Sequence, residues 1–205
     1  MPLVTLPPVP IYFSASGPRA LALAGELADG VVLHVGPDLD SVRTKIAAVR
    51  AGAVEAGRNP AEIDIWGYSY CAVRESRAEA LDDVKAFLAS AAAFGMRPAH
   101  AMAAVPEHLK EKVRELQRRY DVTQHTGPGG TNARLVDELG LADFLAGRTT
   151  VAGSPAEVRD QVAGLARAGI GTLFCALPGN TDPDGTLVRF AAAARPGAIA
   201  AMEDR

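Results

Sequence analysis

Short apolar runs alternate with longer amphipathic segments along most of the chain. Runs rich in β-branched and aromatic residues predict four strands, at residues 11–15, 31–35, 63–73 and 172–177. Segments with apolar residues at helical spacing separate these runs. Strands that are each followed by a crossover predict a parallel sheet in an α/β fold. Four strands leave two architectures open: an open parallel sheet, or half of an eight-stranded barrel.

Capping residues and glycine stops set the limits of the expected helices. The helices are expected over residues 18–29, from 38 or 40 to 57, over 77–94 and 154–168, and from 184 or 186 to about 196. The tail, residues 197–205, is rich in alanine and is expected to fray. Residues 95–150 are interpreted as a largely helical insertion within a single domain of residues 1–205, and long insertions of this kind usually either cover a site or are mobile.

The turn after the first strand is the main candidate for chemistry. Ser14, Ala15, Ser16 and Gly17 have small side chains, so backbone amides there can approach a ligand closely. Pro18 suits the first position of a helix, with Ser16 or Gly17 as the N-cap. The uncharged strand before the turn is expected to be buried on both faces.

A strand that turns through small residues into a helix N-terminus favours anion binding, because free N–H groups and the positive end of the helix dipole meet there. We therefore interpret Ser14–Pro18 as a phosphate site, most readily for the phosphate of a cofactor. The alternative is an ordinary βα turn, in which Ser-Gly-Pro only caps the helix.

Composition excludes several classes of partner. The chain has 205 residues, 48% of them hydrophobic, so one sizeable core is expected. The net charge of -3 argues against a nucleic-acid partner, which normally requires a basic face. Neither a long apolar run nor a secretory signal is present, so we expect no membrane association and a cytoplasmic location. The two cysteines are expected to be reduced, and no spacing indicates a metal site.

Several motifs, in order along nearly the whole chain, resemble a known family. The first motif, residues 10–29, reads P-x-Y-x-S-A-S-G-P-R-A-L-x-L-A-G-E-x-A-D. The others are Gly30–Val32, Glu55–Pro60, Val151–Val158 and Ala168–Ile170. Together they resemble the C-terminal half of the bacterial-luciferase-like family, in its branch that depends on coenzyme F420 and includes the methylene-tetrahydromethanopterin reductases.

The resemblance implies a fold and an activity. Members are (β/α)8 barrels that hold coenzyme F420 or FMN at the carboxyl ends of the strands and transfer hydride, or use reduced flavin with oxygen. The strands here would be the fifth to eighth of such a barrel, with Ala15, Ser16 and Gly17 near the cofactor's phosphate or ribityl chain. The substrate would be a small organic molecule. The family's first four strands, with most of its catalytic side chains, have no counterpart here, so no catalytic residue can be assigned.

Half of a barrel leaves two strand edges and an apolar inner face uncovered, which is unfavourable for a monomer. We therefore expect a homo-oligomer, to which the apolar lead-in Pro2–Pro8 could contribute. A second hypothesis is an inactive half-barrel remnant that self-associates and binds a phosphorylated ligand weakly or not at all.

Other side chains are secondary candidates. His34, at the end of the second strand, is expected to line the pocket, against the alternative of a half-buried histidine bonded to backbone. Trp66, Tyr68 and Tyr70 alternate and so share one face, where they serve as core or interface, or stack on a flat ring. His125, in a glycine-rich loop, is assigned to a surface loop rather than to a lid. His100 and His108, also in the insertion, are assigned no role and are expected to face solvent.

Overall fold

The computed structural model describes residues 8–125, 129–177 and 183–203. It contains one parallel sheet of five strands. The strands are β1 (Tyr12–Ser14), β2 (Gly30–His34), β3 (Asp64–Val73), β4 (Thr150–Gly153) and β5 (Thr172–Ala176). The helices are α1 (Pro18–Leu27), α2 (Leu39–Glu55), α3 (Arg77–Ser90), α4 (Ala99–Ala103), α5 (Glu107–Arg119), α6 (Thr131–Glu138), α7 (Ala142–Thr149), α8 (Pro155–Ala168) and α9 (Pro183–Glu203). The lead-in Pro2–Pro8 lies, up to Pro7, outside the described residues.

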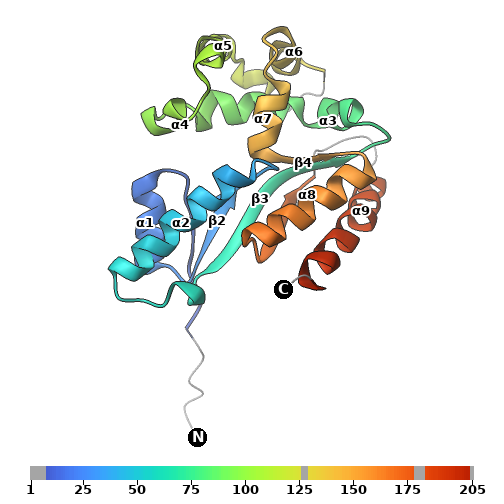
Figure 1. Cartoon of the computed structure of the whole chain (residues 1–205). Coiled ribbons are helices and arrows are strands. Elements are labelled where there is room, and N and C mark those ends of the chain that lie inside the picture. Colours follow the sequence, from blue (N-terminus) through green and yellow to red (C-terminus); the bar gives the residue numbers. More distant parts are fainter. Residues whose placement is uncertain (1–7, 126–128, 178–182, 204–205) are drawn as a thin grey trace, which may run out of the picture.

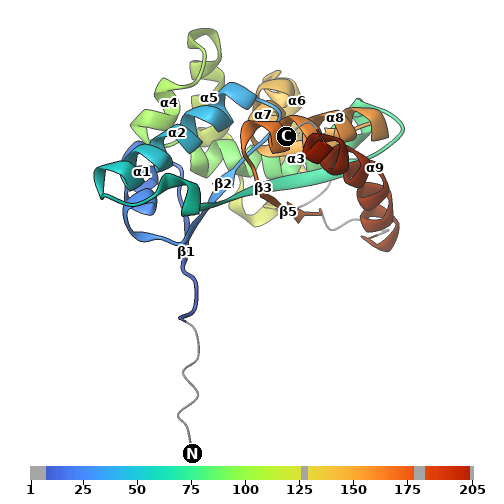
Figure 2. The ribbon, with the colours of Figure 1, turned by 60° about the horizontal axis from the view of Figure 1, so that its bottom comes forward.

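The long strand β3 organises the sheet, because β2, β4 and β5 all pair with it (Figures 1 and 2). Trp66 pairs with Val32 of β2 and also with Thr172 of β5, so these two strands lie on opposite edges of β3. Tyr70 pairs with both β4 and β5, which places β4 on the same edge as β2, further along. The sheet therefore has four strand positions, namely β1, then β2 continued by β4, then β3, then β5.

Strand β4 is an addition to the four strands that the sequence predicted. Its sequence, TVAG, is too short and too rich in small residues to be separated from the insertion by pattern alone. All four of its residues are buried, between β3 and the helices around it. Its strand conformation thus depends on its place beside β3, which is tertiary information.

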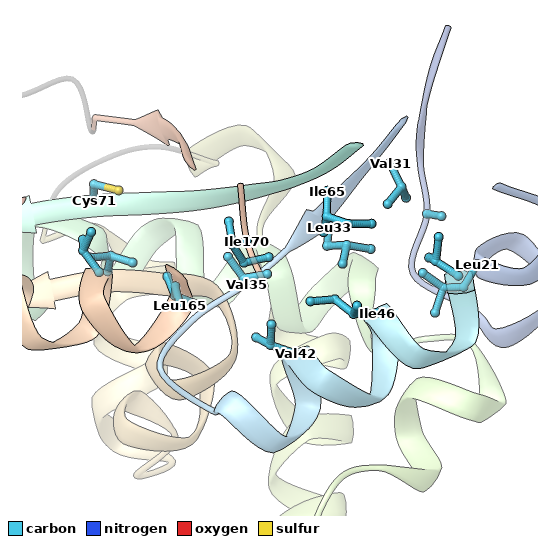
Figure 3. Packing of buried hydrophobic residues seen from close by; sticks show 14 of the residues in the cluster. Leu21, Val31, Leu33, Val35, Val42, Ile46, Ile65, Cys71, Leu165 and Ile170 are labelled. Atoms are coloured by element: carbon cyan, nitrogen blue, oxygen red, sulfur yellow. The ribbon is translucent and has the colours of Figure 1, made fainter. Parts of the chain in front are cut away.

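Helices cover one face of this sheet and leave much of the other face open (Figures 1 and 2). The covered face carries odd-numbered side chains, among them Leu33, Ile65 and Cys71, which pack against α1, α2, α8 and α9 (Figure 3). A second cluster gathers α3, α5, α6 and α7 near the carboxyl end of β3, where Tyr70 and Ala72 join it. The helices of the described residues include none that is both long and apolar enough to cross a membrane.

The expectation that the first strand is buried on both faces was wrong. Tyr12 and Phe13 are half-buried, Ser14 is exposed, and Ile11 before them retains 60% of its exposure. The reason is position: β1 is an edge strand, and helices cover only one of its faces.

The final helix also departs from expectation, because it continues through Pro196 to Glu203 instead of ending there. Gly197 lies against the backbone of Arg159, so closely that a Cβ would collide with its carbonyl oxygen. Close packing on α8 explains why the chain stays helical through Pro196 and Gly197, two residues that disfavour a helix interior.

We predict that Gly52→Ala lowers the free energy of unfolding by about 1–3 kcal/mol, because a Cβ at Gly52 would overlap the backbone of Ala22 where α1 and α2 cross. Urea unfolding followed by circular dichroism measures this change. The matched control is Gly147→Ala on α7, where a Cβ meets nothing, and it is expected to be neutral or slightly stabilising. Equal stability of the two variants would contradict the close crossing.

Candidate functional site

The open face of the sheet forms a depression of about 530 Å³. It is lined by Ser14, Val32, His34, Trp66, Tyr68 and Phe174. All six are even-numbered residues of parallel strands, so their side chains share one face. None carries a formal charge when the histidine is neutral. The depression is therefore suited to a flat, largely uncharged group rather than to a highly charged one.

The aromatic wall at β1 and β3 is fixed by one carboxylate. Asp64 accepts hydrogen bonds from the Tyr12 hydroxyl and from the Trp66 indole N–H, both at 2.6 Å. The hydrogen bond to Asp64, with burial adding to it, raises the pKa of the Tyr12 phenol above its ordinary value. The two rings lie 5.3 Å apart, so the indole is held in place from two sides.

Further along β3, Tyr68 stacks on Phe174 of β5, with ring centroids 5.6 Å apart and planes 24° from parallel. Phe174 nevertheless retains 54% of its exposure. The expectation that Trp66, Tyr68 and Tyr70 share one face is confirmed by the structure, but they divide their roles. Trp66 and Tyr68 line the depression, whereas Tyr70 packs on Phe87 under α3.

His34 lies at the end of β2, with its ring 5.1 Å from that of Tyr68 and 5.4 Å from that of Tyr70. Among the described residues no atom bonds its buried Nε2. Burial, helped by the positive charge of Lys45, lowers the His34 pKa to about 4. Lys45 donates from Nζ to the His34 carbonyl at 2.6 Å, and its own burial lowers its pKa to about 8. The imidazole is thus neutral at pH 7.

The turn from β1 into α1, called the rim below, adjoins the depression at Ser14. Gly17 is the N-cap of α1, with Pro18 at the first helical position and no side chain capping the helix. The first N–H groups of a helix have no partner within it, so Arg19 and Ala20 present their amides at this end. Ser14 and Ser16 are exposed at the rim.

Ala15 differs from its neighbours in the turn. Its N–H donates to the Val32 carbonyl at 3.3 Å, and its side chain is buried on the helix-covered side of the sheet. Its amide is therefore used within the sheet, and the anion-binding capacity of this turn lies with the residues that follow it.

His100 is a residue that the sequence did not connect with this site. It lies on the short helix α4, yet a Cβ on Gly17 would come within 2.9 Å of its Cε1 and 3.0 Å of its Nε2. The exposed imidazole therefore lies over the N-terminus of α1. No sequence signal could have found it, because α4 is too short for a periodic pattern and is remote from Gly17 along the chain.

His125 does not contribute to the depression. Its Nδ1 bonds the Tyr120 hydroxyl, and its ring contacts Phe94 of the same helical cluster. Part of the glycine-rich loop that follows it, residues 126–128, lies outside the described residues. No group of three potential metal ligands occurs among the residues that the structure describes.

Comparison with known proteins agrees with this geometry. A family model described as luciferase-like monooxygenase matches residues 1–172. The chain belongs to this family. The 5,10-methylenetetrahydromethanopterin reductase of Methanopyrus kandleri is 27% identical over 178 residues, which cover 86% of this chain and 47% of the reductase. The F420-dependent glucose-6-phosphate dehydrogenase of Nakamurella multipartita is 38% identical over 86 residues, or 41% of this chain and 25% of the dehydrogenase.

Solved structures show the same fold. The coenzyme F420 dependent tetrahydromethanopterin reductase from Methanopyrus kandleri superposes with a TM-score of 0.63 at 24% identity, over 92% of this chain and 50% of the reductase. An F420-dependent secondary alcohol dehydrogenase, in complex with an F420–acetone adduct, superposes with a TM-score of 0.59 at 18% identity, over 95% of this chain and 49% of the dehydrogenase. This luciferase-like chain thus spans about half the length of the reductase and of the secondary alcohol dehydrogenase, and its sheet is half of a luciferase-like (β/α)8 barrel.

We predict that the buried, neutral His34 makes stability depend on pH. Its pKa of about 4 lies below the value of 6.5 for an exposed histidine, so the unfolded chain binds the proton first as the pH falls. The free energy of unfolding should therefore fall by roughly 3 kcal/mol between pH 6.5 and pH 4 through this one group. Urea unfolding across this range, compared with His34→Gln, measures the difference. Parallel pH profiles for the two proteins would contradict a buried neutral imidazole.

Proposed function

We propose that this luciferase-like chain binds coenzyme F420 against the open face of its sheet and serves hydride transfer between that cofactor and a small organic substrate. FMN is the alternative cofactor. The observation that carries the proposal is an uncharged aromatic depression whose lining includes Ser14 and His34, the last residues of β1 and β2, with the uncapped N-terminus of α1 following shortly after Ser14. In open α/β folds and in barrels alike, this end of the sheet is where ligands bind.

The residues present fit such a cofactor. A phosphate suits the rim formed by Ser14, Ser16, Gly17 and Pro18, where amides of α1 lack a capping side chain. A flat ring system suits the wall of Trp66, Tyr68 and Phe174. When bound, a deazaflavin or flavin supplies a two-electron hydride carrier.

His34 would line the pocket as a neutral group, because its burial keeps it unprotonated at pH 7. Its unpartnered Nε2 is then available to accept or donate one hydrogen bond, depending on the tautomer. We also propose that residues 95–150 act as a cover within the single domain, since α4 brings His100 over Gly17.

The names of the relatives support the choice of cofactor. Several are named as F420-dependent enzymes, and others among the solved structures carry FMN or monooxygenase names. Because the chain spans only about half of each reductase, turnover by this chain is part of the proposal. So is its assembly into a homo-oligomer, which would cover the open face.

The same half-length favours a second candidate, the inactive half-barrel remnant. Such a protein would keep the fold and self-associate, and would bind a phosphorylated ligand weakly or not at all. Turnover with reduced cofactor would exclude it, whereas failure to retain either cofactor would favour it over an enzyme.

The phosphate site is tested by paired substitutions of the N-cap. Both Gly17→Asp and Gly17→Asn place a side chain of the same size beside His100, and both are good helix caps, so the fold should be retained. Only the aspartate adds a negative charge where the cofactor's phosphate would bind, so the Kd for F420 should be about 10-fold higher, or more, in the aspartate variant than in the asparagine variant. Titration followed by deazaflavin fluorescence measures this ratio. Equal affinities would show that no anion binds at this helix end, and FMN titrated in parallel identifies the preferred cofactor.

A further inference from the structure

The sheet ends in two open edges within the part of the chain that the structure describes, while on the outer side of the short β4 the Gln161 side chain bonds the N–H and C=O of Ala152. Strand β1 pairs with β2 only, and β5 pairs with β3 only. An unpaired strand edge is a row of backbone donors and acceptors that can bind a further strand. Both edges belong to strands that run in the same direction, so each needs a parallel partner.

The backbone groups that face outward can be identified at each edge. The Ile11 carbonyl accepts from the Asp29 N–H, and the Ala15 N–H donates to the Val32 carbonyl, so these backbone groups face the β2 side. Because the backbone groups of successive strand residues alternate, the N–H and C=O groups of Tyr12 and Ser14 face the open side. On the other edge, the Gly171 N–H donates to Ile65 of β3. The residues that alternate with it therefore face outward. They are Thr172, Phe174 and Ala176.

The open face between these edges is apolar and aromatic. The depression is lined by six residues without a charged group at pH 7, including Trp66, Tyr68 and the half-exposed Phe174. When two copies of a chain bring the same face together, charged groups of one sign on that face meet groups of the same sign and repel each other. The depression itself carries no such repulsion, and the one carboxylate beside it, that of Asp64, is held by hydrogen bonds from Tyr12 and Trp66.

We propose that a second copy of this chain closes the sheet, with β1 of each copy pairing in parallel with β5 of the other. One two-fold axis parallel to the strands would satisfy all four open edges at once. Each copy contributes four strand positions, so two copies form a closed barrel of about eight, the number whose interior side chains just fill.

The second copy would complete the proposed cofactor site, so the inference rests on the proposed function in this respect. A parallel arrangement brings both α1 N-termini and both His34 rings to the same mouth of the barrel. It also covers Phe174, which one copy leaves 54% exposed. A second copy fits better than an unrelated partner, because one chain already carries both of the edges that must meet.

Sedimentation velocity at micromolar concentration tests the assembly. Wild-type protein should be a dimer, and Phe174→Lys should be monomeric, because the substitution places a charge on the face that becomes the barrel interior. The control is Val54→Lys on α2, where an equally exposed apolar residue (61%) lies on the helical layer outside the sheet, and this variant should remain a dimer. A wild-type monomer would overturn the proposal.

Amide hydrogen exchange of the wild-type protein, read residue by residue by NMR, tests which strand edges form the interface. It does not depend on whether the Phe174→Lys variant folds. The outward amides of Tyr12, Ser14, Phe174 and Ala176 should be protected at least about 100-fold in the wild-type dimer. A dimer in which these amides exchange as fast as an unpaired edge would overturn the proposal.

These outcomes are separable from those of the proposed function. A dimer with protected edges that binds neither F420 nor FMN would uphold this inference and refute the cofactor assignment. A monomer that binds F420 would uphold the cofactor assignment and refute this inference.

Discussion

The structure depends on one constraint: helices cover only one face of its parallel sheet. A parallel sheet is normally covered on both faces, either by helices or by closure into a barrel. Here the odd-numbered side chains of the strands are packed under α1, α2, α8 and α9, while the even-numbered ones remain open. The open face is thus both the unfavourable surface of the molecule and its candidate site.

Strand β3 contributes side chains both to the core and to the open face. Its odd-numbered residues Ile65 and Cys71 belong to the core, and its even-numbered residues Trp66 and Tyr68 line the depression. The carboxyl end of β3 continues into the helical cluster, from which α4 brings His100 to the N-terminus of α1. The aromatic wall of the depression and the contact of His100 with the N-terminus of α1 are therefore held by a single strand and its neighbours.

Much of this arrangement could be predicted from the sequence, because it follows from local patterns. The βα order, the turn at Ser16–Gly17 and the shared face of Trp66 and Tyr68 are set by period and capping, and the structure bears them out. Features set by tertiary contacts could not be predicted. They are the strand at Thr150–Gly153, the exposure of β1, the helix beyond Pro196 and the place of His100.

The central claim is that the open aromatic face is where a cofactor binds. Trp66 tests it most directly, because it is the one tryptophan of the sequence and lies on that face. Titration with coenzyme F420, or with FMN, should quench its emission in a saturable way, as a flat ring stacks nearby. Emission that is unchanged at concentrations where either cofactor is shown to bind the protein would contradict the account.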